Sequence, residues 1–475
     1  MRNLTLLTDM YELTMVGGYL VNGKENQRAN FDYFFRKIPD EGGYCIAAGL
    51  EQVVDYIKNI HFISEDLSYL KNLEIFPKEV LRYLKKFRFT GDLFAVPEGT
   101  VVFPYEPIIR VTAPLPEAQF IESALLNMMN FQTLIATKAS RVCMAAEGDP
   151  VIEFGLRRAH GPDAAIGAAR AAFIGGAQGT SNILAGKLFD LPVRGTVAHS
   201  WIESFPSELE AFRAYCRVYP KDCLLLVDTY DTLKSGIPNA IKIGKELKAQ
   251  GKGKLKGIRL DSGDLSYLSQ EARKMLDREG FNEAKIFASS DLDEWIIESI
   301  KKQGGRIDSW GVGTKLATAY STPALGGVYK LTAIEENGRM QPKIKRSDNP
   351  EKITNPGLKK VVRFFDDLGL MRGDVIFLEE EKLETKPLQV YHPTTPQVSK
   401  VIPLKFSRQE LLIPIFRGGR LVYLKPSLKK IQEHSRQNLK QLGSEFKRFK
   451  NPRIYPVRLS KQLMKIKRDL LREAF

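Results

Sequence analysis

The sequence predicts an α/β protein built around a parallel β-sheet. Between about residues 150 and 334, short β-favouring runs alternate with segments whose apolar residues recur at helical spacing. Such alternation favours parallel strands joined by helices, and the number of units suits an (α/β) barrel, either closed or incomplete. The expected strands are 150–154, 192–197, 223–228, 255–260, 285–288, 307–312 and 327–334. The expected helices are 162–174, 233–249, 265–279 and 293–303.

Both ends of the chain lack this alternation and mix helices with strands. Before residue 135 the pattern predicts helices at 8–21, 49–60 and 116–141 and strands at 30–36 and 98–111. After residue 340 it predicts a strand at 419–424 and helices at 439–450 and 460–471. We therefore expect an N-terminal α+β domain (1–135), an α/β barrel (136–340) and a C-terminal segment (341–475) that is strongly basic from residue 401.

Composition and charge narrow the roles open to the chain. Its 475 residues are 43% hydrophobic and contain no apolar run of the roughly 20 residues that cross a membrane. With no signal peptide recognisable at the start, we expect a cytoplasmic protein. The net charge is +15, but residues 401–475 hold 19 Lys and Arg against 5 Asp and Glu. This tail favours a solvated basic face over nucleic-acid binding, because no nucleic-acid motif accompanies it.

The four cysteines, Cys45, Cys143, Cys216 and Cys223, follow no metal-ligand spacing. They are also too sparse for a disulfide-stabilised scaffold. We expect them to be reduced thiols in a reducing compartment.

Polar and glycine-rich segments follow the expected strands where each strand ends. Because the carboxyl ends of parallel strands meet at one edge of a sheet, these segments are expected to form one pocket. The segments are 154–160, 175–182, 196–199, Asp228, 259–264, 289–291, 311–314 and 326–327. Together they supply several arginines, several carboxylates and glycine-rich turns.

His199 is one of only five histidines and lies between the expected strand 192–197 and a helix-like stretch. An imidazole at such a strand end can act as a base or accept a phosphoryl group. It can also have a purely structural role and fix the conformation of a loop. The residue pattern alone leaves these roles open.

Three further residues suit a flat, anionic ligand. Arg157 and Arg259 carry planar guanidinium groups that match a carboxylate or a phosphate, although either could form a structural ion pair. Phe154, next to an arginine at a strand end, suits a heteroaromatic ring, or it belongs to the core.

Two short motifs suit phosphate, ribose or metal. Gly311, Gly313 and Thr314 would expose backbone N–H groups and a hydroxyl to a phosphate, although many ordinary turns share this pattern. Asp261 and Asp264 could hold ribose hydroxyls or Mg²⁺. For Asp264, capping of the helix that begins near residue 265 is an almost equal alternative.

Six blocks, in order along the chain, closely resemble those of the nicotinate phosphoribosyltransferase family, type II phosphoribosyltransferases of NAD salvage. The blocks are 8–15, 153–161, 195–200, 259–265, 311–314 and 326–331, and segment 452–457 resembles the family's tail. The resemblance implies an irregular (α/β) barrel of the type II kind plus a smaller α+β domain built from both chain ends. In such a fold, the segment after residue 340 would partly complete the N-terminal domain.

The resemblance also implies an activity. Nicotinate and phosphoribosyl pyrophosphate would give nicotinate mononucleotide and pyrophosphate, with Mg²⁺ as cofactor and ATP as co-substrate of a ligase-type reaction. His199 would be transiently phosphorylated, and Asp261 would be the second catalytic residue. The nicotinate site would comprise Tyr11, Phe154, Arg157, Ser181, Thr196 and Arg259. The phosphoribosyl pyrophosphate site would comprise Gly311, Gly313, Thr314, Gly326 and Gly327. Tyr11 would reach the neighbouring subunit of a homodimer, and the metal ligands stay unassigned.

Ser181 bears on the choice between nicotinate and nicotinamide. Nicotinamide phosphoribosyltransferases of the same superfamily carry an aspartate after the equivalent Gly-Thr, where it accepts a hydrogen bond from the amide. Here Ser181 follows Gly179 and Thr180, and its hydroxyl can donate to a carboxylate. The acid is therefore the expected substrate, with nicotinamide, or another base in a paralogue, as the alternative.

Overall fold

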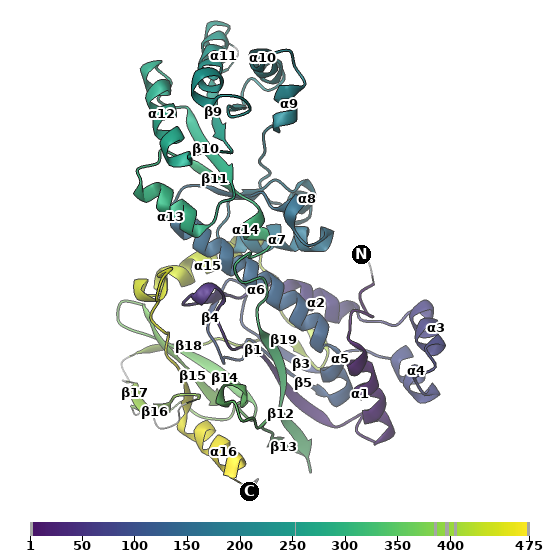
Figure 1. The fold of residues 1–475 in the computed structure, drawn as a ribbon. Helices are drawn as coiled ribbons and strands as arrows, with labels where there is room; N and C mark the ends of the chain where they lie inside the picture. The colour runs from purple at the N-terminus through teal and green to yellow at the C-terminus, as the bar shows by residue number, and fades with distance from the viewer. Residues whose placement is uncertain (1–2, 252, 384–386, 395–398, 403–405, 473–475) are drawn as a thin grey trace. The chain divides into compact units, whose positions relative to one another are not determined.

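The computed structural model describes residues 3–251, 253–383, 387–394, 399–402 and 406–472, which form two compact units (Figure 1). The central unit is the continuous segment Ile135–Pro323. The terminal unit combines the two ends of the chain, Met1–Leu134 and Ala324–Phe475. The expected domain built from both chain ends is thus present.

The central unit is built on a six-stranded sheet in the order β7-β6-β11-β10-β9-β8, with every neighbouring pair parallel. Its strands are β6 (Val151–Glu153), β7 (Gly179–Thr180), β8 (Cys223–Leu226), β9 (Leu255–Leu260), β10 (Lys285–Ser290) and β11 (Ser309–Val312). Apart from a single bridge on β7, the two edge strands pair with no further strand of the described residues. The α/β prediction is confirmed, and the barrel is an open half-barrel.

Helices connect these strands, as β-α alternation requires. They are α7 (Pro162–Ile174), α8 (Ile183–Phe189), α9 (His199–Glu203), α10 (Glu208–Val218), α11 (Ile237–Ala249), α12 (Leu265–Arg278), α13 (Glu294–Lys302) and α14 (Thr314–Ala317). Several begin with a side chain that accepts a backbone N–H of the first turn, among them Asn182, Ser207, Asp264 and Asp293. Asp264 therefore has the capping role that the sequence had left open.

Two of the strand predictions for this sheet were wrong. Segment 192–197 forms only one bridge, from Val193 to Thr180, and otherwise runs as a loop toward α9. Pro192 lacks an N–H for a ladder and Val193 is exposed, so the segment has no buried face. Segment 327–334 is a strand, β12 (Gly327–Glu336), but it pairs antiparallel with a strand of the terminal unit.

The terminal unit contains two larger sheets, of seven strands (β13-β12-β1-β5-β3-β19-β20) and six strands (β17-β16-β21-β15-β14-β18). The strands of the first sheet are β1 (Arg28–Phe35), β3 (Asp92–Ala95), β5 (Ile109–Pro114), β12, β13 (Arg339–Pro342), β19 (Ile413–Arg417) and β20 (Arg420–Leu421). Those of the second are β14 (Lys359–Phe365), β15 (Met371–Leu378), β16 (Leu388–Tyr391), β17 (Ser399–Ile402), β18 (Ser407–Glu410) and β21 (Val457–Ser460). The first sheet joins the chain ends, because β12 pairs with β1 and β19 pairs with β3.

Three of the expected N-terminal elements lie close to their expected positions, namely α1 (Met10–Val21), α2 (Leu50–Asn59) and β1. The expected strand 98–111 was wrong, because this segment is divided between β4 (Val101–Val102), which pairs with β2 (Cys45–Ile46), and β5 in the seven-stranded sheet. Helices α3 (Ser64–Asn72) and α4 (Lys78–Lys85) were not expected. The expected helix 116–141 is divided into α5 (Leu115–Phe120) and α6 (Glu122–Ala145). Near the C-terminus lie α15 (Leu428–Gln441) and α16 (Lys461–Arg472), the second of which was expected.

The region after residue 340 differs most from expectation. It supplies the whole second sheet, so the terminal unit is the larger of the two and the expected "smaller" domain was wrong. The expected helix 439–450 was also wrong. There α15 ends at Gln441, and Gly443 precedes only a single 3₁₀ turn at Ser444–Phe446.

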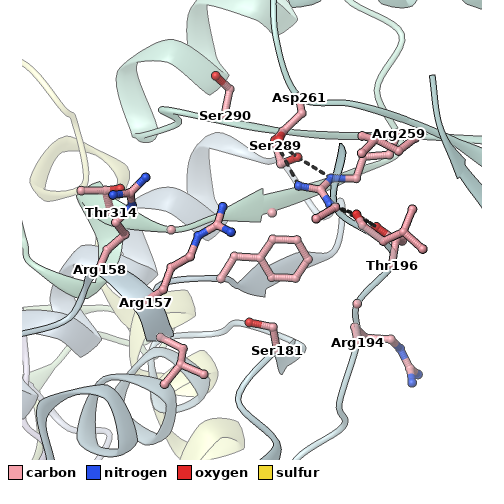
Figure 2. A pocket seen from close by; sticks show the side chains of 18 of the residues that line it. Arg157, Arg158, Ser181, Arg194, Thr196, Arg259, Asp261, Ser289, Ser290 and Thr314 are labelled. Carbon is pink, nitrogen blue, oxygen red and sulfur yellow. Dashed lines mark hydrogen bonds and ion pairs between the residues drawn. The ribbon is translucent and has the colours of Figure 1, made fainter. Parts of the chain in front are cut away.

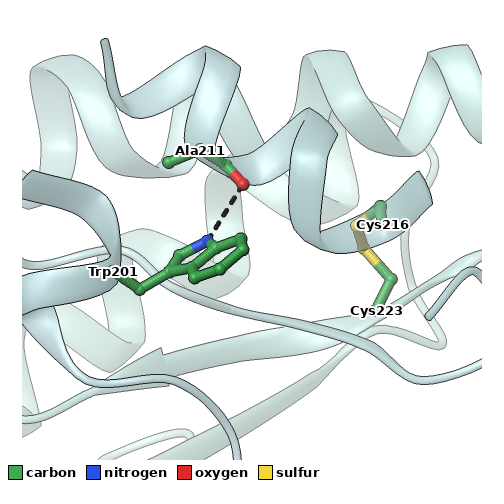
Figure 3. Close-up of a disulfide and its surroundings, with 4 residues drawn as sticks. All are labelled: Trp201, Ala211, Cys216 and Cys223. Carbon is green, nitrogen blue, oxygen red and sulfur yellow. Dashed lines mark hydrogen bonds between the residues drawn. A yellow bond between two sulfur atoms is a disulfide. The ribbon is translucent and has the colours of Figure 1, made fainter. Parts of the chain in front are cut away.

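A disulfide in the central unit corrects the expectation that all cysteines are reduced (Figure 3). Cys216, near the end of α10, is bonded to Cys223, the first residue of β8. A short turn between helix and strand brings their Cα atoms to 5.5 Å, which is within the range that a disulfide requires. The sequence spacing gave no signal of this turn. Cys45 and Cys143 are not part of this disulfide.

The helices of the described residues include none that combines the length and the apolar character needed to cross a membrane.

Candidate active site

A pocket of about 850 Å³ lies in the central unit and is lined by the segments that follow its strands (Figure 2). Ligand sites of open parallel sheets form at this edge because loops from several strands converge there. The lining residues are Phe154, Leu156, Arg157, Arg158, Ser181, Ile183, Val193, Arg194, Gly195, Thr196, Val197, Ala198, His199, Leu226, Arg259, Asp261, Ser289, Ser290, Asp291, Gly311, Gly313 and Thr314.

Arg259, near the end of β9, has its guanidinium held by three neighbouring side chains (Figure 2). Its Nε donates to Ser289 Oγ at 2.8 Å, and its Nη1 donates to Thr196 Oγ1 at 3.0 Å. Its Nη2 donates to Asp261 Oδ1 at 3.1 Å. The side chain is 12% exposed, so the cation is fixed in direction but still open to the pocket. A carboxylate ligand would meet an arginine that is already oriented.

Phe154 supplies a flat apolar surface next to this cation. The Arg259 guanidinium carbon lies 5.6 Å from the centroid of the Phe154 ring. A Cβ on Gly311 would lie 2.8 Å from a carbon of that ring, so glycine is required there for the ring to lie against β11. Gly311 therefore has a steric role that the sequence did not suggest, whereas its contact with phosphate stays a prediction.

His199 is the first residue of α9 and stands between a hydroxyl and a carboxylate. Its Nδ1 lies 3.1 Å from Thr229 Oγ1, and its Nε2 lies 3.6 Å from Asp261 Oδ2. The second distance is too long for a hydrogen bond. The side chain is 39% exposed and lines the pocket, so a ligand there can reach the imidazole while Nδ1 is in contact with Thr229.

Asp228 holds the segment that carries Asp261 in place, a role that the sequence did not assign. Its Oδ2 accepts hydrogen bonds from the backbone N–H of Asp261 and from Ser262 Oγ, both at 2.7 Å. Its buried Oδ1 accepts none from the residues that the structure describes. The only signal in the sequence was the position of Asp228 at the end of an expected strand.

Most of the expected site residues meet in this one pocket. They are Phe154, Arg157, Ser181, Thr196, His199, Arg259, Asp261, Gly311, Gly313 and Thr314. Further lining residues are Arg158, Ser289, Ser290 and Asp291, which belong to segments expected in the pocket, and Arg194, which was not expected there. In Figure 2, Arg157 and Arg259 extend toward the middle of the pocket from opposite sides.

Three expected residues lie in the terminal unit instead. Gly326 and Gly327 stand at the start of β12, and Tyr11 is near the start of α1. Tyr11 is 44% exposed. Partial burial and the nearby Glu122 carboxylate raise the pKa of Tyr11 to about 12, so its phenol is neutral at physiological pH.

Comparisons with known protein families find matches along almost the whole chain. Residues 150–368 match the model of the nicotinate phosphoribosyltransferase family, residues 6–130 match its N-terminal domain and residues 358–467 match its C-terminal domain. The nicotinate phosphoribosyltransferase of Bacillus subtilis is 48% identical over 473 residues, which cover 99% of this chain and 96% of that protein. The enzyme of that name from Homo sapiens is 31% identical over 528 residues, covering 98% and 96%.

Solved structures give the same result for the fold. The crystal structure of human nicotinic acid phosphoribosyltransferase superposes with a TM-score of 0.86 at 28% identity, covering 98% of this chain and 99% of that one. The nicotinate-nucleotide pyrophosphorylase of Pyrococcus furiosus shares the fold, with a TM-score of 0.72 at 24% identity and coverage of 92% and 96%. The chain therefore belongs to the nicotinate phosphoribosyltransferase family.

Proposed function

We propose that the chain transfers a phosphoribosyl group to nicotinate, releasing pyrophosphate, and that ATP hydrolysis drives the reaction through a phosphohistidine. The observation that carries this proposal is the convergence of two groups in one pocket. Phe154 and the fixed cation of Arg259 suit a flat pyridine carboxylate, while His199 presents an open Nε2 beside Asp261. Both groups are open to the same cavity.

In the transfer step, the pyridine nitrogen attacks the anomeric carbon of the ribose as the bond to pyrophosphate breaks. Positive charge develops on the sugar and negative charge on the leaving group, so the enzyme acts mainly by positioning and electrostatics. Arg259 would anchor the carboxylate and Phe154 the ring, with Ser181 donating to the carboxylate. Arg157 faces Arg259 across the pocket and would stabilise negative charge.

In the coupling step, Nε2 of His199 would attack the γ-phosphorus of ATP, and ADP would leave. The contact between Nδ1 and Thr229 orients the ring for this attack, and Asp261 stabilises the cationic imidazole. Water later hydrolyses the phosphoramidate to phosphate and restores the histidine. A phosphohistidine would add about two negative charges beside Asp261, and we propose that this reshapes the site for its substrates.

The chain's carboxylates also suit Mg²⁺. This ion is commonly held by one or two carboxylates together with substrate phosphates, and it neutralises charge on those phosphates. Asp261 lines the pocket, and Asp228 behind it has a buried oxygen without a hydrogen-bond partner among the described residues.

The remaining expected contacts extend this proposal. Thr314, Gly313 and Gly311 would contact phosphoribosyl pyrophosphate, as would Gly326 and Gly327 in the terminal unit. Tyr11 would complete the nicotinate site of a second copy of the chain in a homodimer. Its partly exposed side chain is compatible with that role.

A substitution at Ser181 tests the choice of base. Ser181→Asp is expected to lower the ratio of kcat/KM for nicotinate over nicotinamide by about 10-fold to 100-fold, because a carboxylate repels the acid and accepts from the amide. The measurement is steady-state kinetics with each base. Ser181→Ala, which removes the hydroxyl without adding charge, is the control and should move the ratio less. An unchanged ratio in Ser181→Asp would contradict the argument.

The direct test of the function is a product assay with purified protein. Nicotinate, nicotinamide and quinolinate are each supplied with phosphoribosyl pyrophosphate and Mg²⁺, with and without ATP. The proposal expects nicotinate mononucleotide as the main product, in higher yield with ATP. Preferential use of either other base, or a rate with nicotinate that ATP does not change, would contradict it.

A further inference from the structure

Glu153 is a buried carboxyl group behind the pocket that the mechanism above does not use. It is the last residue of β6, it is 1% exposed, and it does not line the pocket itself. Burial raises the pKa of Glu153, an effect that hydrogen bonds from Thr180 and Gly155 oppose. A buried carboxyl group is unfavourable unless its contacts compensate for lost hydration, so its partners indicate its purpose.

The first contact of Glu153 fixes the turn that carries Phe154. Its Oε1 accepts the backbone N–H of Gly155, which lies on the other side of Phe154 in the chain. A Cβ on Gly155 would lie 2.8 Å from this Oε1 and 2.2 Å from the Cβ of Ala317. The turn at residue 155 packs so closely against the Glu153 carboxyl group and Ala317 that it leaves no room for a side chain larger than that of glycine.

The second contact fixes the segment that carries Ser181. Oε2 of Glu153 accepts from Thr180 Oγ1 at 2.6 Å, and the same Thr180 Oγ1 accepts the backbone N–H of Asn182 at 3.0 Å. The backbone oxygen of Glu153 also accepts the N–H of Ser181 at 2.9 Å. Ser181 is thus held directly and through both of its neighbours in the chain.

Phe154 and Ser181 both line the pocket, and the contacts of Glu153 join the two segments that carry them. We propose that Glu153 is a positioning residue that keeps the Phe154 ring and the Ser181 hydroxyl in register, and thereby sets the enzyme's preference for a pyridine carboxylate. This inference rests on the proposed function and adds a determinant of its specificity. Phe154 and Ser181 contact the base, whereas Glu153 acts through them.

The contacts also imply that geometry, rather than charge, is what Glu153 supplies. Its hydrogen-bond partners are a backbone N–H and a hydroxyl, both neutral. A glutamine could accept from Gly155 with its oxygen and donate to Thr180 with its amide group. Glu153→Gln should therefore preserve the arrangement, whereas Glu153→Ala should release both segments.

The test compares Glu153→Ala, Glu153→Gln and wild type in steady-state kinetics. For Glu153→Ala we expect KM for nicotinate to rise about 10-fold or more and the preference for nicotinate over nicotinamide to fall about 10-fold, because a slight displacement of positioning groups has effects of this order. KM for phosphoribosyl pyrophosphate and phosphorylation of His199 should change little. Glu153→Gln should resemble wild type in all these measurements.

Glu208→Ala is the matched control. Glu208 is another buried glutamate of the central unit, 4% exposed, and it accepts from Ser235 and Asn239 away from the pocket lining. Its loss should lower stability without changing the preference between the two bases. If Glu153→Ala does not fold, Thr180→Val removes only the hydroxyl contact and should shift the preference in the same direction by a smaller factor.

Three results would overturn the proposal. They are an unchanged base preference in the folded Glu153→Ala or Thr180→Val protein, an equal rise of KM for both substrates, and a Glu153→Gln enzyme as impaired as Glu153→Ala. Wild-type enzyme that makes no product from nicotinate would instead contradict the proposed function. The two failures are therefore distinguishable in the same set of assays.

Discussion

Two arginines, one in each unit, have similar neighbours and different exposure. Arg363 on β14 and Arg259 on β9 each bind an aspartate, Asp374 and Asp261 respectively. Each guanidinium carbon also lies near a phenylalanine ring. The distance to the ring centroid is 5.5 Å from Arg363 to Phe103 and 5.6 Å from Arg259 to Phe154. The side chain of Arg363 is only 1% exposed, whereas that of Arg259 is 12% exposed and lines the pocket.

The two guanidinium groups differ in whether protein contacts bury them completely or leave part of the group exposed to the pocket. Nε and Nη2 of Arg363 both donate to Asp374, Nη2 also donates to the backbone oxygen of Val101, and Tyr455 donates to the same aspartate. Arg259 is held by a similar number of bonds but keeps one side open to the cavity. The same pair of residue types is therefore buried within the fold in one unit and lines the pocket in the other.

The largest effect is expected from breaking the closed pair. Asp374→Ala would leave the charge of Arg363 buried without its partner, and we expect a loss of about 3–5 kcal/mol in the free energy of unfolding. Urea unfolding measures this, and the folded enzyme should keep its KM for nicotinate. Glu79→Ala, which breaks an exposed pair with Arg82, is the control and should have little effect. An Asp374→Ala protein as stable as wild type would contradict the comparison.

The open pair should show the reverse pattern. Arg259→Ala is expected to lower kcat/KM for nicotinate by about 100-fold to 1000-fold, since it removes the cation that would pair with the carboxylate. Its unfolding free energy should change less than that of Asp374→Ala. Arg213→Ala removes an arginine of the same unit that pairs with Glu246 outside the pocket lining, and it should leave catalysis unchanged. A large stability loss with normal kinetics in Arg259→Ala would make the two arginines equivalent.

The disulfide gives the smallest expected effect and concerns the central unit alone. In the chain-entropy view, closing the short loop between Cys216 and Cys223 stabilises the fold by about 2–3 kcal/mol. Wild-type protein should therefore unfold at lower urea concentration after treatment with a dithiol reductant. The Cys216→Ala, Cys223→Ala double variant should not respond to the reductant. Equal unfolding midpoints for oxidised and reduced wild type would contradict a stabilising role.

The parts of the fold that sequence could predict are those governed by local pattern. Helix 162–174 matches α7 and strand 255–260 matches β9, because apolar spacing reports directly on the buried face. The pocket residues were also predictable, since strand order in a parallel sheet places their carboxyl ends together. The capping role of Asp264 was one of the two alternatives that its position before a helix allowed.

The parts that could not be predicted depend on contacts between distant segments. Strand β12 continues the β-α pattern but pairs with β1, nearly 300 positions earlier, so local sequence assigned it to the wrong sheet. Segment 192–197 has strand-like residues, but among the described residues it forms only one bridge, from Val193 to Thr180. The Cys216–Cys223 bond could be predicted only with knowledge of the turn that brings the two residues together. The role of Asp228 could be predicted only with knowledge of where the Asp261 backbone lies.

We propose that His199, whose Nδ1 contacts Thr229 and whose side chain lines the pocket, couples ATP hydrolysis to the transfer reaction. The most direct measurement incubates wild-type protein and His199→Ala with ATP labelled in the γ-phosphate and maps acid-labile, base-stable phosphate by mass spectrometry. We expect label on His199 in wild type and, in the variant, no label, no ATP hydrolysis and only slow transfer that does not depend on ATP. Acid-labile phosphate on the His199→Ala protein would contradict it.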